Sequence, residues 1–440
     1  RRHGLDRPNI LFICTDQQSR TAMGAARNPW VDTPHMDSLA AEGVRFTDAY
    51  CGSPVCGPSR ACLLTGRMSH DHGVLVNGMT LRDGVENFGQ LLQRGGYETA
   101  WSGRWHLPEP YPTQSTSPPG FECVLPDPFN HLPRRNLGAS TDEPVTDAAI
   151  TFLRRTHDRP FCLGVALCNP HDICYWIMDR DAPIPSGPLP ELPANFRRDP
   201  QEPEFVQTAR LRDHYGQENM ATPDWSMQRW QAYLAEYYRL THLVDVQIGR
   251  LLSALEQAGL EKDTVVVFTS DHGEGMAAHE LVVKLNLYEP AASVPLLVRG
   301  PDIPQGETRS QLASGVDILP TLCDLAGVEI PSIAGESLLP AIADRGQDQG
   351  QGREFVVSQL YPDTQDLSLA GRMLRSRDHK YLCFNSGERP EMLFHLGDDP
   401  GECHNLALAP VSPAALGQHR EWLKRWLRAS ADPFQSAPLN

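Results

Sequence analysis

The sequence predicts an α/β protein with a large, mostly parallel central sheet flanked by helices and a smaller C-terminal α+β subdomain containing a short antiparallel sheet. Short apolar runs alternate with helical patterns along most of the chain, as they do in parallel-sheet proteins. Three of these runs end in polar residues, which is typical of strands whose carboxyl ends border a functional crevice. A length of 440 residues allows one large domain and one smaller domain.

Each predicted central strand is a short apolar run that ends in polar side chains. The first run, residues 9–14, is followed by Thr15-Asp16-Gln17-Gln18. The other two runs and their polar ends are Phe161–Leu167 with Asn169-Pro170-His171, and Thr264–Thr269 with Ser270-Asp271-His272-Gly273. Since the carboxyl ends of parallel strands lie at one edge of a sheet, these polar side chains are expected to share one crevice.

The helical pattern is clearest over residues 227–258, where apolar positions recur at spacings of three and four and Gly259 suits a carboxyl cap. We interpret this helix as a structural crossover. A second helix is predicted over about 145–157. The proline-rich segment 183–203 is predicted to be a surface loop, either a wall of the substrate site or a plain structural excursion.

The character of the sequence changes at about Gln347, where residues 348–352 have the composition of a linker. We therefore divide the chain into an N-terminal catalytic domain, 1–346, and a C-terminal subdomain, 347–440. The elements expected in the subdomain are a hairpin of Met373–Ser376 with Lys380–Phe384 and an amphipathic helix around 420–428.

Charge and the length of the apolar runs exclude several functional classes. The chain carries 39 Lys+Arg against 55 Asp+Glu, a formal net charge of −16, so its long-range field repels nucleic acid and anionic membranes. A local basic pocket is still allowed. No apolar run approaches the ~18 residues of a transmembrane segment. The eleven cysteines are an odd number and several lie in apolar runs, so we expect mostly buried thiols rather than a disulfide framework.

The stretch most informative about chemistry is residues 53–67, Ser-Pro-Val-Cys-Gly-Pro-Ser-Arg-Ala-Cys-Leu-Leu-Thr-Gly-Arg. Pro58 suits the first turn of a helix, which places Cys56 at or just before the helix N-terminus. Such a position favours anions and lowers the pKa of a thiol. Arg60, one turn on, offers a planar cation that fits oxyanions. The sequence therefore predicts a reactive side chain beside an anion site.

Cys56-Gly-Pro-Ser-Arg60 followed by Leu64-Thr-Gly-Arg67 resembles the type I sulfatase signature C-x-P-S-R-x-x-x-L-T-G-R. The resemblance implies an alkaline phosphatase-like fold and a cysteine oxidised to formylglycine before folding. Its partner would be a formylglycine-generating enzyme or an anaerobic sulfatase-maturating enzyme. One hydroxyl of the hydrated aldehyde then attacks sulfur, the alcohol leaves, and deprotonation of the second hydroxyl expels sulfate.

The resemblance extends to two strand ends that hold a divalent metal in the family. Asp16 closes the opening strand and Asp271 lies in the second metal motif, so both carboxylates, with the oxygen of modified Cys56, are expected to bind the cation. Gln17 and His272 stand where many sulfatases have Asp and Asn, and both are included in the expected ligand set. Calcium is the first choice, and manganese is the alternative because imidazole is a softer ligand than oxygen.

Five further residues match family positions around the sulfate group. Arg104 stands where lysine is usual and keeps the positive charge, and His106 is expected to help deprotonate the intermediate. His171 is expected to protonate the leaving oxygen, which calls for a pKa near the working pH. Lys284 is expected to bind sulfate and assist the leaving group. His279 is interpreted as a substrate-side residue, with a purely structural role as the alternative.

We expect a sulfatase acting on a sulfate ester, most often on a carbohydrate in this family. Tyr175, Trp176 and Trp225 could stack on sugar rings, although such aromatic residues more often pack in the core. The alternative is a phosphonate monoester or phosphodiester hydrolase with the same nucleophile and metal, favoured by Gln17 and His272. A third hypothesis is a non-catalytic binding protein on the same scaffold. The presence of Cys56, Asp16, Asp271, His171 and Lys284 argues against it, because binding alone does not need all five residues. The net charge of −16 favours a pocket for one sulfated end or a small sulfated molecule over a groove for a long sulfated chain.

The chain begins at Arg1 without Met, so we expect that a leader or tag has been removed. A periplasmic or secreted location is expected, with the cytoplasm as the alternative. The sequence leaves the oligomeric state open.

Overall fold

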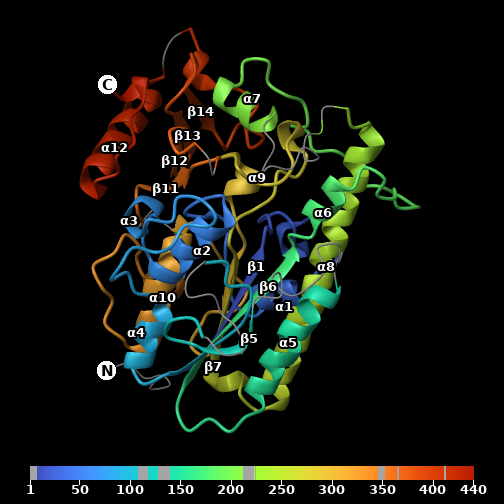
Figure 1. The fold of residues 1–440 in the computed structure, drawn as a ribbon, viewed down its shortest axis with the longest axis vertical. Coiled ribbons are helices and arrows are strands. Elements are labelled where there is room, and N and C mark those ends of the chain that lie inside the picture. Colours follow the sequence, from blue (N-terminus) through green and yellow to red (C-terminus); the bar gives the residue numbers. More distant parts are fainter. Residues whose placement is uncertain are drawn as a thin grey trace.

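The computed structural model describes residues 7–107, 117–126, 139–211, 222, 224–344, 352–363, 366–410 and 413–440. A large α/β body carries a smaller sheet and the terminal helix at one end, which is the upper end in Figure 1. In the described part of the chain, no helix has the length and apolar character that a membrane span requires.

The main sheet has eight strands in the order β5-β4-β6-β1-β7-β8-β2-β9. Their bounds are β1 (Asn9–Asp16), β2 (Val44–Phe46), β4 (Glu98–Gly103), β5 (Glu122–Leu125), β6 (Phe161–Pro170), β7 (Thr264–Ser270), β8 (Leu296–Arg299) and β9 (Glu307–Arg309). The five strands from β5 to β7 are mutually parallel, whereas β8 is antiparallel to both β7 and β2. The predicted mostly parallel central sheet is confirmed.

Different helices bury the two faces of this sheet, because successive strand residues point to opposite faces. The helices are α1 (Pro34–Ala41), α2 (Cys56–Thr65), α4 (Phe88–Arg94), α5 (Ala139–Leu153), α8 (Met227–Gln257) and α10 (Ile318–Ala326). Ile10, Phe12 and Cys14 of β1 pack in a core with α2, α4 and α10, whereas Leu11 and Ile13 pack with α1, α5 and α8. Burial on both faces explains why the central strands are continuous apolar runs.

Two predicted helices are present with adjusted ends. α8 begins at Met227, where the Ser226 side chain accepts a hydrogen bond from the backbone N–H of Arg229, and it ends one residue before the predicted limit. Gly259 follows its carboxyl end with a φ of 70°, the left-handed conformation common there. α5 starts and ends earlier than the predicted 145–157, and it includes Pro144, a residue that ordinarily marks a helix boundary.

The smaller sheet confirms the predicted antiparallel C-terminal unit. Its strands are β11 (Phe355–Leu360), β12 (Gly371–Ser376), β13 (His379–Phe384) and β14 (Glu391–His395), in that order. The predicted hairpin is β12 with β13, and the predicted amphipathic helix is α12 (Ala414–Ser430), which packs on this sheet. The boundary between 346 and 347 lies outside the described residues, as does the linker 348–352 apart from Gly352, so the division into 1–346 and 347–440 stays a prediction.

The remaining short elements connect these layers. They are β3 (Ala49–Tyr50), β10 (Ala313–Ser314), α3 (Ser69–His72), α6 (Ile173–Met178), α7 (Glu204–Leu211), α9 (Glu289–Ala292) and α11 (Leu339–Ala343). All eleven cysteines are free thiols, and nine of them are buried, as the sequence predicted.

Candidate active site

The polar ends of β1, β6 and β7 lie side by side at one edge of the main sheet. Thr15 pairs with Ser270 of β7, and Asp16 pairs with Pro170 of β6. The amino end of α2 approaches the same edge and brings Cys56 to it. The prediction that these polar strand ends meet at one edge of the sheet is therefore confirmed.

Cys56 is the first residue of α2, as predicted, and Val55 is the N-cap. Its buried Sγ atom lies 3.1 Å from Nε2 of His272 and 3.8 Å from Oδ1 of Asp16. Burial and Asp16 oppose ionisation of the thiol, but Lys284 and His272 outweigh them and lower the pKa of Cys56. The side chain at position 56 thus has the electropositive setting of a reactive residue.

Two arginines hold the two strand-end carboxylates. Arg60 donates to Asp16 from Nη2 at 2.9 Å and to Asp271 from Nε at 3.0 Å, so it bridges β1 and β7. Its Nη1 donates to the carbonyl of Arg104 at 2.9 Å, and Nε of Arg104 lies 2.7 Å from Oδ2 of Asp16. Burial alone would raise the pKa of Asp16, but Arg104, His171 and Arg60 lower it well below its usual range. The guanidinium of Arg60, expected to face an oxyanion, instead orients the two carboxylates.

Asp16, Cys56, Asp271 and His272 form a group that could hold a metal ion. All four are buried, and one ligand atom from each lies within 4.8 Å of the others. Two carboxylates and an imidazole fit Ca²⁺ or Mn²⁺, whereas a thiol is a poor ligand for a hard cation. An oxygen in place of the sulfur, as formylglycine provides, completes a donor set suited to either ion.

Gln17, the fifth expected ligand, lies beside this group and connects it to Lys284. Its backbone N–H donates to Oδ1 of Asp271 at 3.0 Å. Its side-chain Oε1 accepts a hydrogen bond from Nζ of Lys284 at 2.6 Å, and its Nε2 donates to Glu274. The φ of Gln17 is 69°, a left-handed conformation uncommon outside glycine.

His171 and His106 reach the site from two constrained turns. His171 follows the cis Asn169–Pro170 peptide bond, and the buried Asp142 of α5 accepts hydrogen bonds from both the backbone and side-chain nitrogens of Asn169. His106 has a φ of 58°, and its Nδ1 lies 3.3 Å from Nη2 of Arg104.

Burial and nearby cations lower the pKa of both histidines. Burial, assisted by Lys284, lowers the pKa of His171 well below its usual value. Burial and Arg104 do the same for His106. In the ligand-free site these surroundings favour a neutral imidazole at His171, and its role as the general acid stays a prediction.

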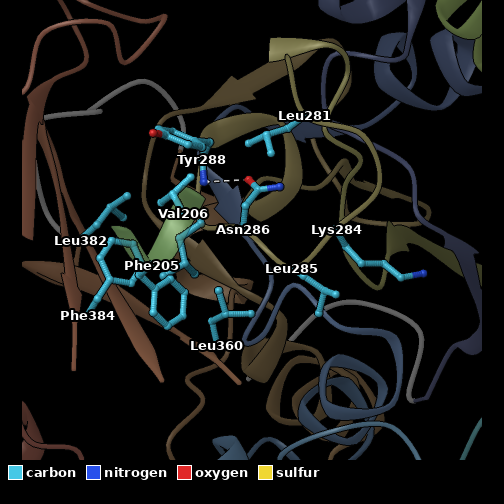
Figure 2. A pocket seen from close by; sticks show the side chains of 11 residues that line it. Phe205, Val206, Leu281, Lys284, Leu285, Asn286, Tyr288, Leu360, Leu382 and Phe384 are labelled. Atoms are coloured by element: carbon cyan, nitrogen blue, oxygen red, sulfur yellow. Dashed lines mark hydrogen bonds between the residues drawn. The ribbon is translucent and has the colours of Figure 1, made fainter. Parts of the chain in front are cut away.

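Lys284 and His279 lie on the segment between β7 and α9. The buried Lys284 side chain turns away from a small apolar pocket lined in part by Phe205 and Phe384 (Figure 2). His279 is 1% exposed, and its ring stacks on that of Tyr288 with centroids 4.1 Å apart. This stacking gives the ring a packing role, and its position beside the substrate stays a prediction.

The proline-rich loop 183–203 contacts the segment that carries His279, because the carbonyl of Asn195 accepts a hydrogen bond of 2.7 Å from the backbone N–H of His279. Both interpretations of this loop, a wall of the substrate site and a plain structural excursion, stay predictions. Of the two roles considered for Trp176, core packing is the one observed, since its ring is 2% exposed and packs edge-on against Trp225. Tyr175 is half-buried, with its ring centroid 6.5 Å from that of His171.

Three residues of the site had no functional assignment from the sequence. The hydroxyl of Tyr233 donates to Glu274, and the hydroxyl of Tyr237 donates to the carbonyl of Gln17 at 2.7 Å. Burial raises the pKa of Glu274. The sequence did contain one signal for the two tyrosines. They lie four residues apart on one face of α8, and a face that only packs against the core would need no hydroxyl groups.

The chain matches the family model Sulfatase over residues 8–328 and the model N-sulphoglucosamine sulphohydrolase, C-terminal, over 277–425. It is 32% identical to a Delta 4,5-hexuronate-2-O-sulfatase of Bacteroides thetaiotaomicron, over 99% of this chain and 92% of that protein. A solved structure of a 2-O GAG sulfatase aligns with a TM-score of 0.86 at 30% identity, over 97% and 93% of the two chains. The phosphonate monoester hydrolase of Agrobacterium radiobacter shares the fold, with a TM-score of 0.77 at 24% identity over 97% and 95% of the two chains.

Proposed function

Because this chain belongs to the sulfatase family and is a sulfuric ester hydrolase, we propose that it removes sulfate from a glycosaminoglycan-type saccharide by way of formylglycine at position 56. The observation that carries the proposal is the position of Cys56. Cys56 is the first residue of the buried helix α2, and its Sγ lies 3.1 Å from Nε2 of His272. The same Sγ belongs to the group of possible metal-ligand atoms that includes carboxylate oxygens of Asp16 and Asp271.

The burial of Cys56 supports conversion to formylglycine before folding. The residue is 1% exposed, and every residue of α2 is buried, so a maturating enzyme would need the unfolded segment. The hydrated aldehyde would supply the hydroxyl that attacks sulfur. Lys284 and His272, which favour the thiolate of Cys56, would equally favour an ionised oxygen there.

Asp16, Asp271 and His272 would hold a divalent cation together with an oxygen of residue 56. A cation bound there would polarise the sulfate group and stabilise negative charge in the transition state. Calcium suits the two carboxylates, and manganese is the alternative that the imidazole favours. Arg60 contributes by keeping both carboxylates oriented towards one point.

The charges around the site suit an anionic substrate. Arg104 and Lys284 would stabilise the sulfate oxygens as charge shifts during transfer. His171 is neutral in the ligand-free site, and the negative charge of a bound sulfate would raise its pKa. His171 would then carry the proton that the leaving oxygen receives, and His106 would accept a proton in the second half of the reaction.

A substrate panel tests the proposal and its alternative. The metal-supplemented, matured enzyme is assayed with an unsaturated 2-O-sulfated hexuronate disaccharide, glucosamine 6-sulfate, an aryl sulfate, an aryl phosphodiester and an aryl phosphonate monoester. We expect the highest kcat/KM on a sulfated saccharide, with the 2-O-sulfated hexuronate first because of the relative of that name. A preference for a phosphoryl substrate would overturn the proposal and favour the alternative drawn from Gln17 and His272.

Mass spectrometry of the tryptic peptide Phe46–Arg60 tests the nucleophile. Protein produced with a maturating enzyme should carry formylglycine at position 56 and be active, and protein produced without it should carry Cys56 and be inactive. Full activity with an unmodified Cys56 would contradict the proposed mechanism.

A further inference from the structure

Three buried side chains form a hydrogen-bonded chain behind the candidate metal group. Nζ of Lys284 donates to Oε1 of Gln17 at 2.6 Å, and Nε2 of Gln17 donates to Oε2 of Glu274. Gln17 and Glu274 are fully buried, and Lys284 is 3% exposed. The ends of this chain are an ammonium and a carboxylate, and its centre is a neutral amide.

Only one orientation of the Gln17 amide satisfies both neighbours. An ammonium group donates hydrogen bonds and cannot accept them, whereas a carboxylate accepts and cannot donate. The oxygen of Gln17 must therefore face Lys284, and its nitrogen must face Glu274. A flipped amide would place N–H groups against the ammonium and an oxygen against the carboxylate.

Glu274 is itself fixed by donors from two other elements. Its Oε1 accepts hydrogen bonds from the hydroxyl of Tyr233 on α8 and from the backbone N–H of Val283. Val283 directly precedes Lys284 and has a φ of 55°, a left-handed conformation that is strained for a β-branched residue. One carboxylate thus restrains Lys284 twice, through the backbone at Val283 and through the amide of Gln17.

We propose that Glu274 is a positioning residue that holds the Gln17 oxygen towards Lys284 and so fixes the ammonium for the sulfate group. The proposal rests on the proposed function for its catalytic consequence. It also requires a neutral amide at position 17, because a carboxylate there would face Glu274 in the same buried space. That requirement gives a physical reason for glutamine where many sulfatases have aspartate.

The test exchanges the amide of Gln17 and the carboxylate of Glu274 in two steps. In Glu274→Gln, Tyr233 and Val283 still donate to the carbonyl oxygen, so the new NH₂ group faces the NH₂ group of Gln17. We expect a loss of about 30-fold in both affinity for inorganic sulfate and kcat/KM, as for other residues that orient a site through a second side chain. Adding Gln17→Glu restores both hydrogen bonds of the chain, because the new carboxylate accepts from Lys284 and from the new amide at position 274. The total charge is the same as in the wild type.

The double variant Gln17→Glu/Glu274→Gln should recover to within about tenfold of wild type, with incomplete recovery because the negative charge is closer to the sulfate. Tyr233→Phe, which removes one of three donors, should lose about threefold. Glu261→Gln, which alters an exposed partner of Arg299, is the matched control and should leave both measurements unchanged.

A double variant no better than Glu274→Gln would overturn the positioning role, because a merely structural carboxylate would give additive losses. Binding of inorganic sulfate is measured by calorimetry and needs neither turnover nor an identified ester. Rescue of sulfate binding in a protein that hydrolyses no sulfate ester would refute the proposed function and leave this inference standing.

Discussion

This molecule has two buried clusters of charged side chains, and the charges within each cluster are paired in a different way. In the catalytic cluster, defined as Asp16, Cys56, Arg60, Asp271 and His272, Arg60 pairs with both carboxylates, and Asp16 and His272 also face the sulfur of Cys56. The C-terminal charge cluster, defined as Glu289, Lys380 and Glu402, directs its charges at one another. Nζ of Lys380 lies 3.1 Å from Glu289 and 2.8 Å from Glu402.

The difference shows that buried charge is not by itself evidence of a functional site. Lys380 is fully buried, yet its charge is matched by carboxylates from α9 and from the turn after β14. At the catalytic cluster, Lys284 and His272 outweigh burial and Asp16 and lower the pKa of Cys56, which is what a reactive group needs. Substitutions in the first cluster should therefore change activity, and substitutions in the second should change stability.

Replacement of Cys56 should produce the largest separation of activity from stability. In Cys56→Ala, kcat/KM on the preferred sulfate ester should fall by at least about 10³-fold, because the nucleophile is lost. The free energy of unfolding, measured by urea denaturation, should change by no more than about 1 kcal/mol, because the removed atom lies in a polar site. Retained turnover in this variant would refute the assignment of Cys56.

Replacement of Lys380 should have the opposite effect. Lys380→Met leaves Glu402 buried without the cation that faces it, while Glu289 keeps its ion pair with Arg20 at 3.3 Å, so the free energy of unfolding should fall by about 3–5 kcal/mol. The folded fraction should keep kcat/KM within about threefold of wild type. Lys424→Met is the matched control, since Lys424 pairs with Glu421 at the surface and should cost less than about 1 kcal/mol. If kcat/KM of folded Lys380→Met fell far more than threefold while the free energy of unfolding changed little, the distinction between the two clusters would be wrong.

The sign of the pH dependence also separates the two clusters. Burial raises the pKa of Glu402 to about 7 despite the attraction of Lys380, so its stabilising contribution is complete below the unfolded pKa, near 4.5. That contribution is lost as the pH rises from about 4.5 to 7. The pKa of Asp16 is lowered, so its contribution is present above the unfolded pKa of 3.8 and is lost in acid.

Glu402→Gln should therefore remove a decline in stability between pH 5 and pH 8, on the order of 2 kcal/mol in the wild type. Urea midpoints of both proteins at the two pH values provide the measurement. An equal decline in wild type and variant would show that Glu402 is not the titrating group.

The sequence predicted the features that arise from local patterns. The strands β1, β6 and β7, the start of α2 at Cys56, and the group of Asp16, Asp271 and His272 all follow from short apolar runs and the residues at their ends. These elements were predictable because a buried parallel strand needs a continuous apolar run, and because parallel strands end at the same edge.

The features that were missed depend on contacts between distant residues. Gln17 and Glu274 are 257 positions apart, and nothing near Gln17 in the sequence indicates that a carboxylate fixes its amide. The low pKa of His171 likewise reflects burial and the charge of Lys284, neither of which a motif encodes. For Trp176, stacking on a sugar and packing in the core both stayed open, because its sequence neighbourhood does not reveal that its ring packs against Trp225.

The smallest predicted effect concerns an exposed pair that resembles the buried ones only in its geometry. Arg425 of α12 lies 2.6 Å from Glu354, but the two side chains are 56% and 61% exposed. Water solvates both charges when the pair separates, so Arg425→Gln should lower the free energy of unfolding by no more than about 0.5 kcal/mol. Leu423→Ala on the same helix removes a buried contact with the smaller sheet and should cost about 2–5 kcal/mol. If both substitutions shifted the urea midpoint equally, the Arg425–Glu354 pair would stabilise α12 as much as apolar packing does. Burial away from water would then no longer explain why loss of Lys380 lowers the free energy of unfolding more than loss of Arg425.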